Sequence, residues 1–365
     1  MSVRIAILGI RGVPANYGGF ETFAEQLGTR LVERGHAVTV YGRDRYVARG
    51  LRTYRGMRLI RLPAPRSKYF ETVIHSLFAA VHAVGGRHDI VYVCNSANVP
   101  AATLLRLAGR RVVLNVDGLE WKRAKWNRVG RAYYRACEWL AARLPINVVT
   151  DAAVIADHYA TVHGRTIPWF PYGADLEPAP DDGTLARLGL EPRRYVLYVS
   201  RLEPENNAHV VIEAYASVPG EMPLVIVGDA PYADDYIAGL HALADARVRF
   251  VGAIYGGGYR ILQSHSAVYV QATEVGGTHP ALVEAMGYGA AIVARDVPEH
   301  REALGDAGRY YESAADLAAV LSALLEDADG LVSMREAAAA RARTSFGWDA
   351  ITDAYEAWFR ELVGA

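Results

Sequence analysis

The sequence predicts an α/β protein with two doubly wound, Rossmann-like domains. Three observations lead to this fold class. Short apolar runs rich in β-branched residues alternate with longer helical segments along the whole chain of 365 residues. These runs lack alternating polar residues, as expected of strands that are covered on both faces. The alternation also restarts near residue 195, after a segment rich in Pro, Gly and Asp.

Eleven apolar runs are the expected strands. Six of them lie at 4–10, 37–42, 57–62, 89–95, 111–116 and 146–150. The other five lie at 195–200, 223–229, 248–252, 267–272 and 290–294. Helical patterns between them include 20–34, 69–84, 206–217 and 314–326. Ligands of such sheets bind beyond the carboxyl ends of the strands, so a cleft between two facing domains is the expected site.

The segment 170–183 reads as a linker between the domains. We therefore expect an N-terminal domain over 1–170 and a second domain over 171–345. An amphipathic pattern at the end of the chain predicts a last helix over 346–365. The start does not resemble a signal peptide, and no apolar run is long enough to span a bilayer. We expect a cytoplasmic protein whose Cys94 and Cys137 are reduced.

The charge of the chain is distributed unevenly. Residues 1–170 contain 25 Lys and Arg residues but 11 Asp and Glu residues, whereas the whole chain has a net charge of −1. The N-terminal half is therefore strongly basic and the C-terminal half strongly acidic. This asymmetry indicates either an anionic partner for the N-terminal half or two domains that attract one another, and both can hold together.

Several enzyme classes lack their motifs in this sequence. The first glycine loop, GIRGVPANYGG (9–19), has no GxGxxG spacing, and no Tyr lies four residues before a Lys. No P-loop, GxSxG elbow or HExxH motif is present. These absences argue against dinucleotide-dependent dehydrogenases, P-loop proteins, serine hydrolases and zinc hydrolases.

Three motifs lie where the sheets should bind a ligand. Gly18 and Gly19 stand where the first strand turns into the first long helix, and glycine lets backbone approach a ligand closely. Arg201 directly follows a buried strand, where a guanidinium group could meet a phosphate. For each there is a plain structural alternative, namely a tight turn for the glycines and a local ion pair for the arginine.

The third motif is GGTHPALVE (276–284). Thr278 is expected to cap a helix whose first turn holds Pro280, and backbone N–H groups of Gly277, Thr278 and His279 should point into the cleft. Glu284 lies one to two turns later in an otherwise apolar run. As a pure acceptor it suits paired hydroxyl groups such as those of a ribose, although it could instead cap neighbouring backbone.

The segment 119–144 combines basic and aromatic residues. Lys122 precedes a row formed by Lys125, Arg128, Arg131 and Arg135, whose spacing of three and four places them on one helical face. Such a face suits an anionic membrane surface or the phosphates of a lipid-linked acceptor better than nucleic acid. The simpler alternative is a solvated basic face whose aromatic residues pack inward.

Taken together, these strings resemble retaining glycosyltransferases of family 4, which have the GT-B fold. The resemblance covers essentially the whole chain, and GIRGVPANYGGFETFAEQL, VDGLEWKRAKW and RLEPENN are similar to a bacterial subgroup of rhamnosyltransferases. It implies an N-terminal acceptor-side domain, a C-terminal domain that binds the nucleotide sugar, and a last helix that crosses back. No cofactor or metal is implied, because the nucleoside diphosphate sugar is itself the donor substrate.

The resemblance also implies roles for the residues of the motifs. Gly18 and Gly19 would lie near the donor phosphates and the acceptor, and Arg201 would neutralise the diphosphate. The stretch from Gly277 to Pro280 would hold the donor sugar, and Glu284, the second glutamate of a Glu-x7-Glu motif, would bind the ribose. Two residues, Val251 and Ile254, fall where backbone meets the base.

The chain departs from the family pattern at three positions. Gly276 replaces the first glutamate of the motif, and Glu274 is the nearest carboxylate that could substitute for it. Asn206, placed at the donor on the same resemblance, replaces a lysine and leaves less positive charge for the diphosphate. Asp117 replaces a histidine, and it could orient the acceptor or the sugar hydroxyls.

The expected reaction is metal-independent transfer of a hexose, with L-rhamnose from TDP-rhamnose as the first choice. The acceptor would be a saccharide or lipid-linked saccharide, at the inner face of the membrane. The alternatives are a nucleotide-sugar epimerase, a sugar phosphorylase or a non-catalytic sugar-binding protein. A phosphorylase would need a lysine for pyridoxal phosphate in the C-terminal half, and all three lysines precede residue 126.

Overall fold

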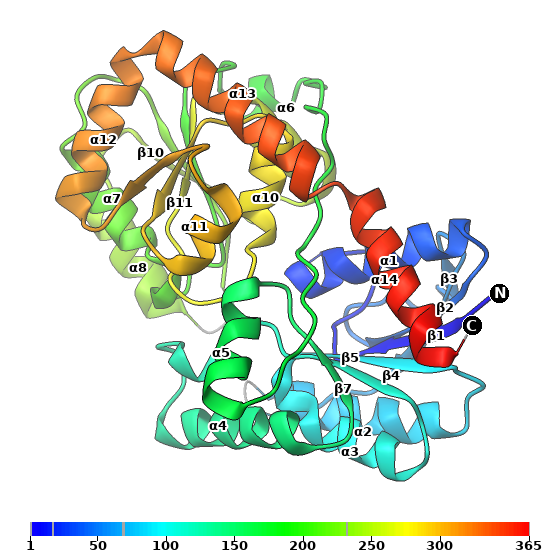
Figure 1. The fold of residues 1–365 in the computed structure, drawn as a ribbon. Helices are drawn as coiled ribbons and strands as arrows, with labels where there is room; N and C mark the ends of the chain where they lie inside the picture. The colour runs from blue at the N-terminus through cyan, green and yellow to red at the C-terminus, as the bar shows by residue number, and fades with distance from the viewer. Residues whose placement is uncertain (1, 17, 68–69, 231–232, 365) are drawn as a thin grey trace. The chain divides into compact units, whose positions relative to one another are not determined.

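A computed structural model of the chain describes residues 2–16, 18–67, 70–230 and 233–364 (Figure 1). The predicted α/β fold class is confirmed, because the chain forms two compact units that each contain a largely parallel sheet. Unit 1 consists of Met1–Lys122, Trp126–Tyr172 and Trp348–Ala365, and unit 2 of Arg123–Lys125 and Gly173–Gly347. The short segment Arg123–Lys125 thus groups with unit 2, which the sequence did not indicate.

Unit 1 is built on a seven-stranded sheet with the order β3-β4-β2-β1-β5-β6-β7. Its strands are β1 Arg4–Leu8, β2 Ala37–Arg43, β3 Thr53–Tyr54, β4 Met57–Leu62, β5 Ile90–Cys94, β6 Val112–Asn115 and β7 Asn147–Val149. All neighbours pair in parallel except β3 and β4. The inner strands β1 and β5 are buried except at Arg4, the exposed first residue of β1, which explains why the rest of both strands is apolar.

Helices cover both faces of this sheet (Figure 1). They are α1 Gly19–Glu33, α2 Glu71–Val84, α3 Val99–Leu107, α4 Arg128–Arg143, α5 Ala153–His163 and α14 Trp348–Val363, with short 3-10 turns at Ser96–Asn98 and Glu120–Lys122. The last helix packs on α1, where Tyr355 lies with its ring centroid 5.4 Å from that of Phe23 and 6.1 Å from that of Tyr92. The end of the chain therefore belongs to the core of unit 1.

Unit 2 is built on a six-stranded parallel sheet with the order β10-β9-β8-β11-β12-β13. Its strands are β8 Val196–Val199, β9 Leu224–Val227, β10 Val248–Gly252, β11 Val268–Gln271, β12 Ile292–Arg295 and β13 Arg309–Tyr311. The central strands β8 and β11 again carry the buried apolar residues. Strand order reverses between β8 and β11, and such a switch point is the usual ligand-binding edge.

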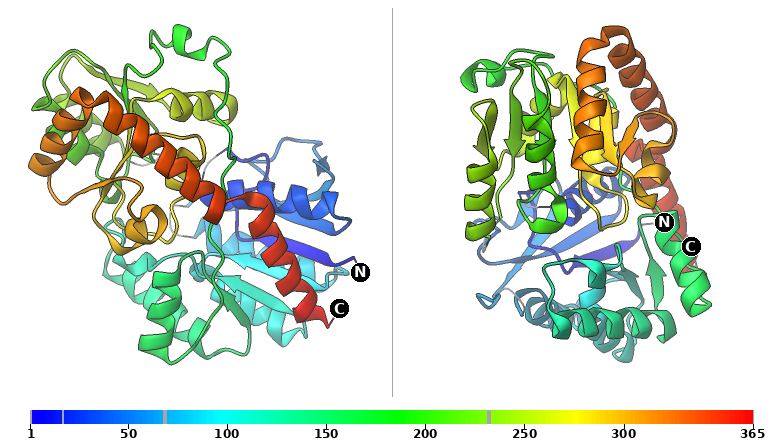
Figure 2. Two further views of the ribbon diagram at one scale, coloured as in Figure 1. Left: turned by 45° about the horizontal axis from the view of Figure 1, so that its top comes forward. Right: turned by 90° about the vertical axis from the view of Figure 1, so that its left-hand side faces the viewer.

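The helices of unit 2 follow its strands in sequence. They are α6 Thr184–Arg187, α7 Ala208–Ala216, α8 Asp234–Leu243, α9 Gly256–His265, α10 Pro280–Gly287, α11 Pro298–Leu304, α12 Ala314–Glu326 and α13 Ala328–Ser345, with a 3-10 turn at Pro204–Asn206. Helix α7 packs with α8 and α12, while α10 packs with α9 and α13. Helices α12 and α13 follow directly on one another and also pack together (Figure 2).

All eleven expected strands are present, and two further strands were not expected. Strand β3 is two residues long and forms a hairpin with β4 through Arg55 and Gly56, which both have positive φ angles. Strand β13 has three residues and lies at an edge of the sheet in unit 2. Edge strands this short carry too few residues for an apolar pattern, so only pairing with a neighbour reveals them.

Two expected helix starts were wrong. Helix α10 begins at Pro280 with His279 as its N-cap, so Thr278 does not cap it. The last helix begins at Trp348 rather than 346. Both cysteines are buried free thiols. Within the residues that the structure describes, no helix has both the length and the apolar character needed to span a bilayer.

Candidate donor and acceptor sites

Arg201 lies at the carboxyl edge of the sheet in unit 2, just after β8. Its Nη1 atom is 3.4 Å from Oε2 of Glu203, and Nζ of Lys125 is 3.3 Å from the same oxygen. Burial opposes ionisation of Glu203, but the charges of Arg201, Lys125 and Arg123 together lower its pKa. The carboxylate therefore holds two cations beside the switch point of the sheet. Glu203 follows Arg201 by two residues, but its role could not be inferred without this geometry.

Asn206 supports the Arg201 turn from within. Its side chain is buried, and Nδ2 donates a hydrogen bond of 2.7 Å to the backbone oxygen of Arg201. Its own backbone oxygen accepts a bond of 2.7 Å from the hydroxyl of Tyr198, which lies on β8. Asn206, predicted at the donor, is thus fixed to the backbone that carries Arg201. Lys125 supplies the further positive charge in this cluster.

The motif 276–284 forms a loop that leads into α10. Gly277 and Thr278 are buried, and Pro280 occupies the first turn of the helix as predicted. The start of α10 lies at the carboxyl end of β11, the neighbour of β8 in the sheet. Backbone N–H groups and the helix dipole make such a start favourable for an anionic group. Arg201 and this loop therefore follow adjacent strands.

His279 occupies the space beside Gly276. A Cβ atom added to Gly276 would lie 2.6 Å from Nε2 of His279, closer than real contacts allow. The first glutamate of the family motif would therefore displace this imidazole. Glu274, the alternative carboxylate, instead forms an ion pair of 2.7 Å with Nη2 of Arg295.

A second histidine orients His279. The Nδ1 atom of His300 lies 2.8 Å from the backbone oxygen of Arg295, so it must carry the proton. Its Nε2 atom then accepts from Nδ1 of His279, at 3.2 Å. Burial lowers the pKa of His300 to about 4 and that of His279 well below its usual value. Both rings are therefore neutral at pH 7, and a backbone hydrogen bond with Val275 also holds the imidazole of His279.

Glu284 is held by a tyrosine that the sequence reasoning missed. The hydroxyl of Tyr259, on α9, donates a hydrogen bond of 2.5 Å to Oε2 of Glu284. Desolvation raises the pKa of Glu284 to about 7, with a further contribution from the negative charge of Asp175, against the opposing effects of Tyr259 and Arg260. A ligand hydroxyl that donates to this carboxylate would favour its ionised form and lower its pKa. The carboxylate of Glu284 in this otherwise apolar run is therefore partnered by the hydroxyl of Tyr259.

Val251 and Ile254 lie at the carboxyl end of the edge strand β10. Both are partly buried, and Ile254 packs close to Gly258 at the start of α9. Tyr255, between them and α9, is 50% exposed. Strand β10 is two positions from β8 in the sheet. This segment therefore lies on the same edge of the sheet as Arg201, separated from it by β9.

Gly18 and Gly19 begin the first helix of unit 1. Gly18 is the N-cap of α1 with an extended backbone, and its oxygen accepts from the backbone N–H of Glu21. Oε1 of Glu21 accepts a bond of 2.8 Å from the backbone N–H of Arg11, which fixes the loop after β1. A Cβ added to Gly18 would lie 3.4 Å from Oε2 of Glu21, an ordinary van der Waals distance, so neither the packing nor the extended backbone of this turn requires glycine.

Asp117 has a left-handed backbone, with a φ angle of 57°. Its N–H donates to Oδ1 of Asn115 at 2.8 Å, and its backbone oxygen accepts from Oγ1 of Thr150 at 3.0 Å. Nδ2 of Asn115 in turn donates to the hydroxyl of Tyr92. Strained residues held in this way by their surroundings often mark functional sites. The turn lies directly after β6, at the carboxyl edge of the sheet of unit 1.

The predicted basic row on 119–144 is only partly correct. Helix α4 begins at Arg128, because Oδ1 of Asn127 accepts a bond from Gly130 N–H and caps it. Arg128, Arg131 and Lys122 have exposed side chains. Lys125 lies outside the helix and pairs with Glu203 of unit 2, so it does not continue the row.

Two parts of the chain match known protein families. Residues 18–169 match the family described as "Glycosyl transferase 4-like domain", and residues 193–327 match the family described as "Glycosyl transferases group 1". A curated relative, the O-antigen chain mannosyltransferase B of Escherichia coli, is 27% identical over 170 residues. That match spans 43% of this chain and 43% of the relative's length.

Solved structures share the fold over nearly the whole chain. The sucrose-phosphate synthase of Thermosynechococcus elongatus superposes with a TM-score of 0.84 at 20% identity and covers 99% of both chains. Anabaena HepE in complex with UDP and glucose gives a TM-score of 0.80 at 19% identity, covering 98% of this chain and all of the other. The protein therefore has the two-domain GT-B fold. Its two halves each match a family of glycosyltransferase domains.

The pKa of Glu284 predicts how the site responds to pH. Because burial raises the pKa to about 7, the carboxyl is largely protonated below that pH and becomes a better acceptor above it. The affinity for a nucleoside diphosphate sugar should therefore increase as pH rises through about 7. A nucleotide sugar is the suitable probe, since it lacks the terminal phosphate whose second pKa is about 6.

Calorimetry with wild type and Glu284→Gln measures this effect. The variant should bind more weakly and lose the pH dependence, whereas Glu312→Gln, which changes an exposed glutamate, should behave as wild type. An unchanged pH profile in Glu284→Gln would show that this carboxylate does not contact the nucleotide.

Proposed function

We propose that the protein transfers a hexose from a nucleoside diphosphate sugar to a hydroxyl of a saccharide or lipid-linked saccharide, with retention at the anomeric carbon. The observation that carries this proposal is the convergence of Arg201, the start of α10 and Glu284 at one edge of the sheet in unit 2. A cation and a helix N-terminus suit a diphosphate, and a buried acceptor suits a ribose. HepE, which has the same fold, is described with UDP and glucose.

The proposed chemistry is electrostatic stabilisation of the leaving group. Arg201 and the backbone N–H groups of Gly277, Thr278 and His279 offset the charge that develops on the diphosphate as the glycosidic bond breaks. The residues that hold Arg201 keep it in place before the substrate arrives. No residue is assigned as a nucleophile, and no metal is assigned to the transfer.

L-Rhamnose from TDP-rhamnose is the proposed donor, on the resemblance of the N-terminal motifs to bacterial rhamnosyltransferases. GDP-mannose is the second candidate, because the curated relative is named as a mannosyltransferase. The imidazole of His279 lies beside Gly276, where the broad family has a carboxylate, so it is the side chain nearest to that position. Synthesis of a cell-surface glycan is the proposed setting.

A thermal-shift screen against TDP-, GDP- and UDP-sugars tests the proposal. A ligand that binds only the folded protein stabilises it in proportion to the logarithm of its concentration over Kd, so the true donor should give the largest shift. The best donor is then incubated with saccharide acceptors and the products are identified by mass spectrometry. Epimerisation of the donor without an acceptor would support the alternative function, and binding without turnover would support a sugar-binding protein.

Arg201→Ala should lower turnover at saturating donor by roughly 10²-fold or more, the scale expected for loss of one group that stabilises the transition state. Arg187→Ala is the matched control, because it removes an exposed arginine from the same unit. Initial rates with the donor found in the screen measure the effect. An unchanged rate would remove Arg201 from the mechanism.

Asp117→Asn should retain affinity for the donor and lose transfer, because we place this side chain on the acceptor side. The substitution keeps the left-handed turn accessible, since Asn tolerates positive φ angles as Asp does. Donor affinity by calorimetry and transfer rate are compared in the same preparation. Loss of donor binding would instead place Asp117 at the donor or in the support of the fold.

We also propose that α4 attaches the protein to an anionic membrane. Three apolar side chains of this helix are exposed: Val129 at 76%, Trp139 at 50% and Leu140 at 37%. Arg128, Arg131, Arg135 and Arg143 are exposed along the same helix. An outward face that combines apolar and cationic side chains is typical of helices that lie in a membrane interface.

Flotation with vesicles tests this attachment. Wild type should float with phosphatidylcholine vesicles that contain phosphatidylglycerol, and high salt should reduce the bound fraction because it screens the charges. Arg128→Glu combined with Arg131→Glu should abolish binding to the vesicles. The control Val332→Ser, which changes an exposed residue of α13, should bind as wild type does. Equal flotation on neutral vesicles, or none on either, would mean that α4 is an ordinary charged surface.

A further inference from the structure

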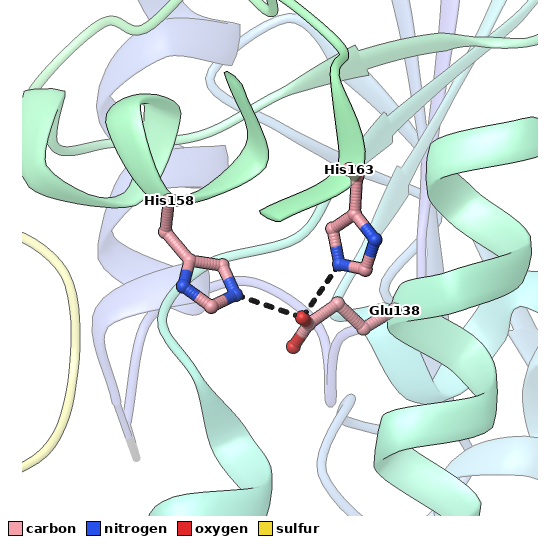
Figure 3. Close-up of side chains that lie close together, drawn as sticks. All are labelled: Glu138, His158 and His163. Carbon is pink, nitrogen blue, oxygen red and sulfur yellow. Dashed lines mark hydrogen bonds and ion pairs between the residues drawn. The ribbon is translucent and has the colours of Figure 1, made fainter. Parts of the chain in front are cut away.

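Helices α4 and α5 bring together three side chains that can ligate a metal. Glu138 projects from α4, and His158 and His163 from α5 (Figure 3). Both histidines direct Nε2 at the same oxygen, Oε1 of Glu138, at 2.8 Å each. The candidate ligand atoms all lie within 4.8 Å of one another, and the part of the chain that the structure describes contains no other such group. None of these residues belongs to the donor or acceptor residues described above.

We propose that Glu138, His158 and His163 bind a divalent transition-metal ion, with zinc as the ion that fits best. Two imidazole nitrogens and one carboxylate oxygen are a known ligand set for zinc, which leaves one position for water. Hard cations such as magnesium prefer oxygen ligands and are disfavoured here. The inference is independent of the proposed glycosyl transfer.

The spacing of the ligand atoms is near that of a metal site. Ligands about 2.0–2.1 Å from a tetrahedral zinc ion are about 3.3 Å apart, compared with the observed 2.8 Å between each nitrogen and the oxygen. The whole set lies within 4.8 Å, so binding would move the oxygen away from the nitrogens and bring the more distant atoms of the set to this spacing. The side chain of His158 is 21% exposed, which gives the ion a route from solvent.

Hydrogen bonds already orient the carboxylate of Glu138 and favour its ionised form. Its other oxygen, Oε2, accepts a hydrogen bond of 2.7 Å from Nε1 of Trp121, which fixes its orientation as supporting groups do in metal sites. Burial opposes ionisation of Glu138, but hydrogen bonds from His158, His163 and Trp121 outweigh it and lower the pKa. In the metal-free state each imidazole donates from Nε2. Each Nε2 must give up that proton before it can ligate a metal ion, so metal binding competes with these hydrogen bonds.

The position of Trp121 gives the site a structural consequence. Trp121 lies four residues after Asp117, in the loop between β6 and α4, and the guanidinium of Arg135 packs 4.6 Å from its ring. An ion held by Glu138 would therefore join α4, α5 and this loop. Its role is to stabilise the fold around the acceptor-side turn.

Calorimetric titration of the full chain with zinc, after treatment with a chelator, tests the proposal. Wild type should bind one equivalent, and cobalt at the same site should give the intense visible absorption of tetrahedral coordination. His163→Ala and Glu138→Gln should each weaken zinc binding by at least about 10-fold, the lower bound for losing even a supporting group. His241→Ala, which removes an exposed histidine from unit 2, should bind as wild type does.

Melting curves of each variant without metal separate a ligand defect from a folding defect. A variant that melts as wild type does but loses zinc supports the site. For a variant that unfolds early, His158→Asn provides the second test, since it keeps a side chain that can donate to Glu138. Absence of stoichiometric binding in wild type, or equal affinity in His163→Ala, would show that the three residues are only a hydrogen-bonded cluster.

Discussion

The burial of parallel strands on both faces is the constraint on which the rest of the structure depends. Strands β1, β5, β8 and β11 have helices on either side, so nearly all of their side chains are apolar, with Arg4 and Gln271 at strand ends as the exceptions. Polar groups that meet a ligand can then occur only where strands end. Arg201 after β8, the 276–284 loop after β11 and Asp117 after β6 all occupy such ends.

Each of these polar groups depends on a second layer of hydrogen bonds. Asn206 holds the backbone of Arg201, and Tyr259 holds Glu284. The support for Asp117 extends furthest. It passes from Asn115 to the hydroxyl of Tyr92 and then to Tyr355, so that the last helix of the chain braces a turn at residue 117. Charged and strained groups need such supports because water cannot solvate them once they are partly buried.

The loop at 276–284 shows how a departure from a family pattern can be accommodated. Gly276 has no side chain, and the imidazole of His279 fills the adjacent space. His300 then fixes the tautomer of His279 through a bond to the Arg295 carbonyl. Arg295 also pairs with Glu274, so Glu274, His279 and His300 belong to one connected group around the loop.

The sequence alone determined the fold class, eleven of the strands and the positions of Arg201, Asp117 and Glu284. These features depend on local order, because apolar runs and the residue that follows each run are read directly along the chain. Only the tertiary structure showed that Tyr259 donates to Glu284 and that Lys125 pairs with Glu203 instead of lying on the basic face of α4. It also showed that Glu138 contacts His158 and His163. These pairs are separated by 20 to 78 residues. Their contacts are set by how helices and loops pack on the sheets, and no periodicity in the sequence records that packing.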